Sequence, residues 1–488
     1  MSDLRTKTYR GAFWSAIDAL GARFVQFVVG IVLARLLLPE QFGLIGMLAI
    51  FMAITQSLLN SGFGSALIQK QELTDADTSS VFYFNIVVSL VLAGILWLAA
   101  PWIAAFYSQP ILTALTRALS LVIVIDAFSV VQRAVLTRNL DFKTQTRVSL
   151  AAGVGSGAIG IVMAYNGFGV WSLAVQQVSA ALFRALLLWL FNTWRPRLLF
   201  SVQSLQQMFR FGSRLLVSSL LNQAFRNVHY VVIGRLFAPA ALGFYTRARQ
   251  MEQLPAMTLS SIVSRVAFPT FSALQADDAR LKRALQKALA VLVFFNAPVM
   301  IGLAVAAEPL VLVLLTERWL PSVPYLQLLC IAGLISPLHV LNLNVLMAKG
   351  RSDLFLRLEV LKKALALISI AILWRWGISA LIIGQIVTSL LSFLLNSYYT
   401  GKFLGYGALM QIRDVGVYLL LALIMGVGVY SLTALPISGD LLLLLAQIGS
   451  GIAIYLLFCL LFQPPAFVEI WTLLRARIAE RKYANQSA

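Results

Sequence analysis

Polar side chains recur along three helix-length segments that are otherwise apolar. The candidate binding residues on them are Arg23, Gln26, Asn222, Gln223, Arg226, Arg249 and Gln253. At about 100° per residue they form one stripe on each segment, within an arc of about 140° on the first two and about 60° on the third. A charge at mid-membrane costs at least about 2.5 to 3.5 kcal/mol, so such residues normally face a bundle interior or a water-filled cavity. The stripes therefore predict one shared polar cavity.

Three further residues have chemistry that could move protons: Asp18, Asp126 and His229. A buried carboxylate can exchange protons near neutral pH, and histidine titrates there without help. Each carboxylate also has a plainer interpretation, which is that it neutralises an arginine. His339, alone among apolar residues, is interpreted as a hydrogen-bonded interior histidine. The residues leave the choice of coupling group open.

The elements that position these residues must lie in a bilayer. The chain is 60% hydrophobic and 12% charged, with a mean hydropathy of +0.86, whereas about a quarter of the residues in soluble domains are charged. Apolar stretches long enough to cross about 30 Å of hydrocarbon follow one another from end to end, without the alternation of barrel strands. We expect an all-α membrane protein of about fourteen spans between residues 12 and 462. The first span is too long for a cleavable signal and should remain in the mature protein.

The basic residues are placed on one side of the membrane and do not form a patch on a soluble surface. The 38 lysines and arginines against 19 acidic residues give a net charge of +19, and the basic residues fall in alternate loops. By the positive-inside rule both termini are cytoplasmic, and the pattern excludes a nucleic-acid partner. The two cysteines, Cys330 and Cys459, fall inside predicted spans, so we expect no disulfide framework, no metal site and no cofactor.

One pattern returns at an offset of two hundred residues. The sequence reads VLARLLLPEQFG at 32–43 and VIGRLFAPAALG at 232–243. Six helices separate equivalent points, so the two halves run parallel and are related by an axis along the membrane normal. Arg35 and Arg235 repeat faithfully but point away from the polar stripes. The predicted organisation is an N-lobe at 1–194, a cytoplasmic amphipathic linker at 195–212, a C-lobe at 213–400, two additional spans at 401–462 and a cytoplasmic basic tail at 463–488.

Eight motifs in order resemble a known family. They are LARLLLPEQFGLIGM, LTDADTSSVFYFN, LTRNLDFK, GFGVWSLAVQQV, GRLFAPAALGFYTRARQMEQLP, AFPTFSALQADDARLK, MAKGRSD and LGYGALMQIRDV. The chain resembles the Wzx-type polysaccharide flippases, in particular the WzxC-like colanic acid exporter branch of the PST family in the MOP exporter superfamily. The resemblance implies two pseudo-symmetric six-helix lobes around a central cavity, often followed by two more helices.

The resemblance also implies a substrate and partners. Family members turn over undecaprenyl-pyrophosphate-linked oligosaccharides from the cytoplasmic to the periplasmic leaflet, for exopolysaccharide, capsule or lipopolysaccharide assembly. The resemblance implies that the membrane is a bacterial inner membrane. The implied partners are the lipid-linked oligosaccharide, membrane lipids, and the polymerase and glycosyltransferases of the pathway. Arginine suits a diphosphate because its planar guanidinium binds phosphate bidentately and keeps its charge at low dielectric.

Other function classes fit the sequence less well. No P-loop occurs, so a secondary mechanism is expected. A glycosyltransferase or polymerase would need a sizeable aqueous catalytic loop, and the longest loops here are about twenty residues; we expect no enzyme. A scaffold would need no internal polar stripes. The remaining alternative is a multidrug or other small-molecule antiporter of the same superfamily, whose cationic substrates an arginine stripe would repel.

Overall fold

The computed structural model describes residues 21–60, 63–472 and 475, and all regular structure among them is helical. The chain divides into two compact units, Met1–Thr246 and Arg247–Ala488. This boundary falls inside a helix, α9, whose first turns pack with the first unit. The expectation of an all-α protein is confirmed within the described residues.

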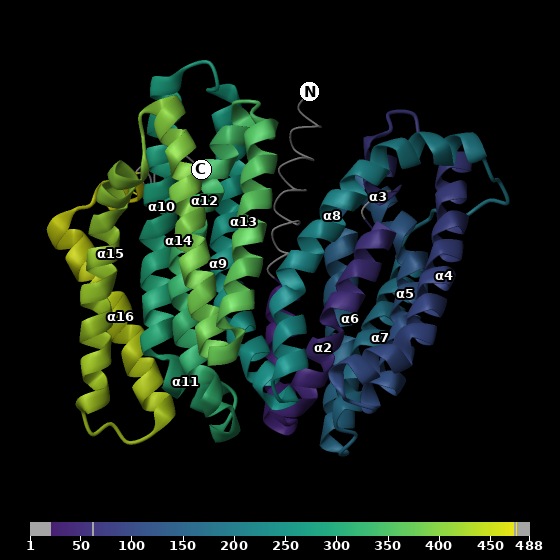
Figure 1. Ribbon diagram of the computed structural model, residues 1–488, viewed down its shortest axis with the longest axis horizontal. Helices are drawn as coiled ribbons and strands as arrows, with labels where there is room; N and C mark the ends of the chain where they lie inside the picture. The colour runs from purple at the N-terminus through teal and green to yellow at the C-terminus, as the bar shows by residue number, and fades with distance from the viewer. Residues whose placement is uncertain (1–20, 61–62, 473–474, 476–488) are drawn as a thin grey trace, which may run out of the picture. The chain divides into compact units, whose positions relative to one another are not determined.

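The first unit is a bundle of long helices (Figure 1). It contains a helix over residues 21–36, α2 (Pro39–Asn60), α3 (Phe63–Gln69), α4 (Asp75–Tyr107), α5 (Ile111–Arg138), α6 (Phe142–Tyr165), α7 (Val170–Phe191), α8 (Val202–Leu236) and the start of α9 (Pro239–Ala273). The start of α4 is set by a capping box, in which Thr74 and Asp77 each accept a hydrogen bond from the other's backbone N–H. Helix α9 continues through two prolines, Pro255 and Pro269.

The second unit contains the rest of α9 and the remaining helices. They are α10 (Asp278–Val305), α11 (Ala307–Leu314), η1 (Glu317–Ser322), α12 (Val323–Ala348), α13 (Ser352–Leu373), η2 (Trp374–Trp376), α14 (Ile378–Leu404), α15 (Ala408–Ser431), η3 (Leu432–Ala434) and α16 (Asp440–Phe462). Within this unit α15 and α16 lie beside α10 (Figure 1). Their aromatic side chains join its core, where the Tyr455 hydroxyl donates to the carbonyl of Phe294 at 2.8 Å. The two additional spans are therefore packed elements of the second unit.

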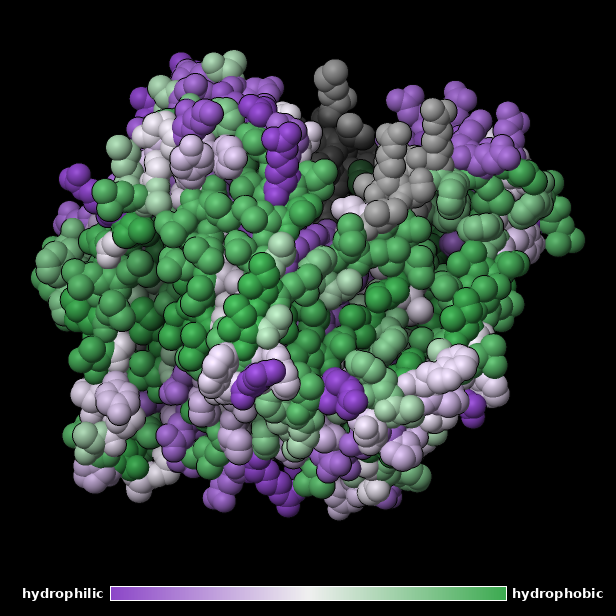
Figure 2. Space-filling view, in the orientation of Figure 1, coloured by the Kyte–Doolittle hydropathy of each residue, from purple (hydrophilic) through white to green (hydrophobic). Residues whose placement is uncertain are grey.

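Ten described helices are long and apolar enough to cross a membrane. Each unit shows an apolar belt between more polar ends (Figure 2). The chain is thus a multi-pass membrane protein, but the expected count of fourteen is not confirmed. The described helices expected to span but outside those ten are the one over residues 21–36, α8, α9 and α13. Of the first expected span, only residues 21–36 are among the described helical residues, while α8, α9 and α13 carry charged residues in their interiors.

The two copies of the repeated motif, at 32–43 and 232–243, contact each other inside the first unit. Helices α2 and α9 both begin at a repeated proline, Pro39 and Pro239, and each places a repeated glycine against the other's first residue. A Cβ on Gly43 would lie 1.8 Å from the Pro239 carbonyl oxygen, and one on Gly243 would lie 1.9 Å from that of Pro39. Only glycine allows backbones to approach so closely. The offset of two hundred residues therefore corresponds to a reciprocal contact.

The segment between α7 and α8 is held on the start of α4 by a row of buried hydroxyls. Three donors on the segment each reach one of them: Trp194 Nε1 to Thr78 at 3.1 Å, Arg197 N–H to Ser79 at 2.9 Å, and Ser201 N–H to Ser80 at 2.7 Å. We call this arrangement the hydroxyl clasp. The expected linker at 195–212 becomes helical at Val202 and continues into α8 without interruption.

Candidate functional site

The predicted binding residues of the first unit lie on the helix over residues 21–36 and on α8. Arg23, Gln223 and His229 are half-buried, while Gln26 and Asn222 are exposed. Asp18, the coupling candidate on the same first span, lies outside the described residues. Helix α2 is joined to α8 beside these groups, since the hydroxyl oxygens of Ser57 and Ser219 are 2.5 Å apart.

Helix α8 exposes a polar face where a lipid-facing helix would expose an apolar one. Among its described side chains between residues 216 and 234, the exposed ones are Ser218, Leu221, Asn222 and Arg226. The three polar residues follow one another at a spacing of four, so they share one face. Helix α14 shows the opposite pattern, because Ile383, Val387, Leu390 and Leu394 are exposed there. The exposed face of α8 is therefore suited to water or a polar ligand rather than to lipid tails.

Asp126 is a buried carboxylate with two partners in the first unit. It is 4% exposed on α5. Gln56 of α2 donates to its Oδ2 at 2.6 Å, and Arg184 of α7 donates to its Oδ1 at 3.2 Å. This ion pair matches the plainer interpretation of the residue, neutralisation of an arginine. Its role in coupling stays a prediction.

In the second unit Arg249 of α9 links two helices. Its Nη1 donates to Gln385 Oε1 of α14 at 3.4 Å and lies 3.6 Å from Glu252 Oε2. Glu252 is buried, and Gly333 of α12 makes room for it, since a Cβ there would lie 2.8 Å from Glu252 Oε1. Gln253 is half-buried beside them. Arg249 thus forms an ion pair with Glu252 and a hydrogen bond with Gln385, which together fix the position of its side chain.

Comparison with known proteins identifies the family. The family model described as "Polysaccharide biosynthesis protein" matches residues 32–324. The chain belongs to this family. It is 30% identical over 378 residues to the lipopolysaccharide biosynthesis protein WzxC of Escherichia coli (strain K12), covering 76% of this chain and 75% of that protein. It is likewise 30% identical over 329 residues to the succinoglycan biosynthesis transport protein ExoT of Rhizobium meliloti (strain 1021), covering 67% of each.

Solved structures show the fold of this polysaccharide biosynthesis protein. The lipid II flippase MurJ in an inward closed conformation superposes with a TM-score of 0.76 at 16% identity, covering 92% of this chain and 98% of that one. An inward-facing multidrug resistance MATE family transporter of the MOP superfamily gives 0.63 at 16% identity, covering 80% and 100%. The MOP-like fold and the resemblance to Wzx-type proteins are confirmed. These relatives are named as transport or biosynthesis proteins.

Sequence reasoning missed a charged group on α13 of this family member. Glu359, Lys362 and Lys363 lie near the middle of the helix, and Lys362 pairs with Glu359. The side chains of Lys362 and Glu359 are 10% and 25% exposed, whereas the neighbouring Leu356 and Val360 are exposed, so this ion pair lies on the less exposed side of α13. The sequence did contain a signal for this group, namely a run of charged residues at the centre of an expected span.

His339 of α12 is half-buried. Its Nδ1 atom is buried and has no hydrogen-bond partner among the described residues, so the hydrogen bond expected from the sequence is not seen at that nitrogen. The contacts of Asp126 with Gln56 and Arg184 were also missed, and the same holds for Glu252 beside Arg249. The two Asp126 contacts join residues from different helices, which no spacing rule in the sequence predicts. Arg249 and Glu252 are three residues apart on α9, so their contact follows from helical spacing and could have been predicted.

Proposed function

We propose that this chain moves an undecaprenyl-pyrophosphate-linked oligosaccharide from the cytoplasmic to the periplasmic leaflet of a bacterial inner membrane by alternating access. The observation that carries the proposal is the exposed polar face of α8, with Arg226 near the centre of the span that the sequence predicts there. A charge exposed there needs water or a polar ligand. Family membership supports a polysaccharide precursor as that ligand.

The substrate's diphosphate is assigned to the arginines. Arg23, Arg226 and Arg249 supply guanidinium groups, and the amide groups supply hydrogen bonds to sugar hydroxyls. The full proposed set is Arg23, Gln26, Asn222, Gln223, Arg226, Arg249 and Gln253. Asp18, Asp126 and His229 are the proposed coupling groups. The chain acts without forming or breaking a covalent bond of the substrate, and both termini are placed in the cytoplasm.

A lobe organisation accompanies this function. The six-helix lobes at 1–194 and 213–400 would rock about the bound substrate, with the segment at 195–212 as their connection. The cytoplasmic tail at 463–488 carries basic residues that suit an anionic membrane surface. The polymerase and glycosyltransferases that make and consume the repeat unit are the proposed partners.

Reconstitution tests the proposal directly. Purified protein in liposomes should reorient a fluorescently labelled lipid-linked oligosaccharide, measured as the fraction accessible to a membrane-impermeant sugar-modifying reagent. The lipid recovered afterwards should have an unchanged mass. The control is the same preparation with Arg226→Ala. A changed mass would indicate an enzyme, and release of small cations without lipid movement would favour the antiporter alternative.

A further inference from the structure

A pocket lies on the surface of the second unit, where α14 ends and α15 begins. Its volume is about 430 Å³, and it is lined by Leu394, Tyr398, Gly401, Lys402, Gly407 and Ala408. Two of these residues are glycines, and they hollow the surface. Gly401 and Gly407 approach so closely that a Cβ on Gly401 would lie 3.1 Å from the Cα of Gly407. Gly405 ends α14 in the left-handed conformation, with φ of 60°. The pocket is therefore a product of the turn itself.

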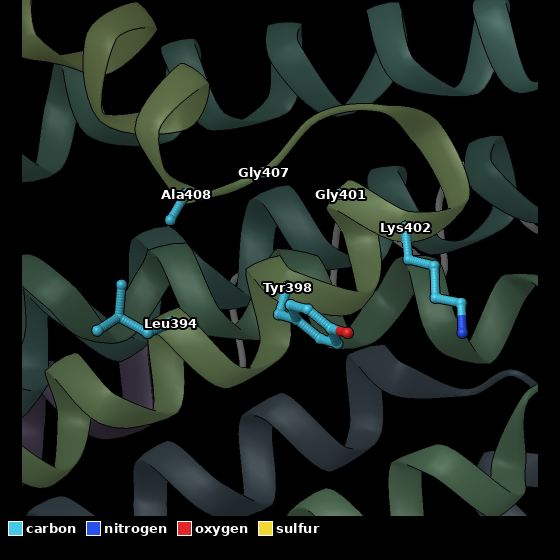
Figure 3. Close-up of a pocket in the computed structure, with 6 residues that line it drawn as sticks. All are labelled: Leu394, Tyr398, Gly401, Lys402, Gly407 and Ala408. Atoms are coloured by element: carbon cyan, nitrogen blue, oxygen red, sulfur yellow. The ribbon is translucent and has the colours of Figure 1, made fainter.

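The lining side chains are ordered by polarity (Figure 3). Leu394 and Ala408 lie at one end, and Lys402 lies at the other. Tyr398 lies between them, with its hydroxyl directed towards the Lys402 end. The pocket passes from an apolar end through an amphipathic ring to a cation. This order complements a phospholipid, which passes from its acyl chains through glycerol to an anionic phosphate. Tyrosine and lysine are also the residues that typically sit at headgroup level.

The charge of the pocket is positive, and no acidic side chain among the described residues forms an ion pair with it. Lys402 is exposed in the last turn of α14 and makes no ion pair with a described residue. Asp414 of α15 is engaged elsewhere, because its Oδ2 accepts hydrogen bonds from Tyr406 at 2.8 Å and from Gln286 at 2.9 Å. An anion in the pocket would therefore meet one unpaired ammonium group.

An exposed apolar track leads away from the pocket along the same helix. Leu391 and Leu394, which precede Tyr398 on α14 by seven and four residues, are exposed. Residues 391 to 402 rise by about 16 Å at about 1.5 Å per residue, which is close to half of the roughly 30 Å hydrocarbon thickness. A helix that places Lys402 at the membrane surface thus offers one leaflet's depth of apolar contact beneath it.

We propose that this pocket binds an anionic glycerophospholipid. Its phosphate pairs with Lys402, the Tyr398 hydroxyl meets the glycerol region, and an acyl chain lies on Leu394 and Leu391. A phosphodiester such as that of phosphatidylglycerol carries one negative charge, which the single lysine matches, whereas a diphosphate would leave charge unbalanced. The proposal goes beyond the transport function and needs only that α14 crosses the membrane. With the proposed topology the lipid comes from the cytoplasmic leaflet.

Lipid titration of the whole delipidated protein, followed by native mass spectrometry, tests this. We expect tighter binding of phosphatidylglycerol than of phosphatidylethanolamine. One lysine near a surface contributes about 1 kcal/mol, so Lys402→Gln should weaken phosphatidylglycerol about five-fold. Gly407→Leu should weaken it by filling the pocket at unchanged charge. The backbone allows this change, because Gly407 has φ of −80° and a Cβ there would meet only the Gly401 Cα at 4.0 Å.

The matched control is Arg413→Gln, which removes an exposed cation from α15 outside the pocket lining. It should bind phosphatidylglycerol like the unmodified protein. Equal weakening by Arg413→Gln, or none by Lys402→Gln, would overturn the proposal, since general surface charge would then account for binding. So would preferential binding of undecaprenyl phosphate, or full competition by inorganic phosphate alone. If Gly407→Leu does not purify, the comparison of Lys402→Gln with Arg413→Gln decides alone.

Discussion

Gly43 and Gly243 each pack against the first residue of the helix that carries the other. The distances that a Cβ would reach, 1.8 and 1.9 Å from backbone carbonyl oxygens, are nearly equal, so the contact is reciprocal. Two residues at the same place in a repeated motif thus occupy the same environment, each formed by the other copy. The repeat in the sequence is in this respect a repeat in packing.

Alanine at either glycine should therefore prevent tight packing of α2 on α9. The obstacle is backbone and cannot rotate away, so we expect a cost at or above the about 1 to 3 kcal/mol of ordinary overpacking. Gly43→Ala and Gly243→Ala should lower membrane abundance and the melting temperature in detergent. Gly94→Ala is the control, because a Cβ there would meet nothing within 4 Å. Wild-type stability of both repeat variants would contradict the close contact.

Loss of one arginine from the proposed binding set should stop export. Each charge-assisted contact is worth roughly 1.5 to 3 kcal/mol, so Arg23→Ala, Arg226→Ala and Arg249→Ala should each weaken substrate binding about ten- to a hundredfold. Arg→Lys should rescue only in part, because a point charge replaces a planar fork. Export of polysaccharide and membrane abundance are measured together.

Arg35 and Arg235 are the controls for those variants. Both are exposed, and the Arg235 guanidinium lies 5.6 Å from the ring centre of Phe106. Their replacement by alanine should reduce abundance more than export per molecule. Normal export by all three binding-set variants would remove the substrate role from them.

The Asp126–Arg184 pair separates a structural from a coupling role. Asp126→Ala leaves Arg184 without its carboxylate and should destabilise the protein, by less than the about 3 to 5 kcal/mol of a fully buried pair because the Arg184 side chain is 30% exposed. Adding Arg184→Ala should restore abundance if the pair only balances charge. Restored abundance with export that no longer responds to an imposed proton gradient would instead assign Asp126 to coupling.

The hydroxyl clasp should protect the segment between α7 and α8 from proteolysis. Ser79→Ala and Ser80→Ala each remove an acceptor from a backbone N–H, at a net cost of about 1 kcal/mol. Trypsin cleavage after Arg197 should therefore accelerate about five-fold for each change, followed by gel electrophoresis. Ser431→Ala, which alters a hydroxyl at an exposed helix end, serves as the control. Unchanged cleavage would mean that the clasp does not limit local opening.

Cysteine labelling tests the proposed topology. Ser108→Cys and Ser438→Cys, at exposed loop positions, should react with an impermeant maleimide from the periplasm. Ala276→Cys, between α9 and α10, should react only after the membrane is opened. Background is expected to be low because Cys330 and Cys459 are buried. The reverse labelling pattern would place the termini outside.

The sequence predicts the parts of this molecule that depend on local pattern. The positions of the membrane helices follow from hydropathy. The repeat in the sequence singles out Gly43 and Gly243 as equivalent positions. Partners such as Gln56 and Arg184 could not be predicted, because they reach Asp126 from 70 and 58 residues away. The charged residues in the middle of α13 are visible in the sequence. Their burial could not be predicted, because it depends on how the neighbouring helices pack. Asp18 lies outside the described residues, so its place is still a prediction.

The reciprocal glycine contact bears on ancestry. The second copy of the motif begins α9, yet its first turns pack in the same unit as α2. A single-copy ancestor with this packing would have lacked a partner for its own glycine. It would have needed a second subunit, arranged in parallel, to supply one. Gene fusion would then have turned an interface between two subunits into an internal contact.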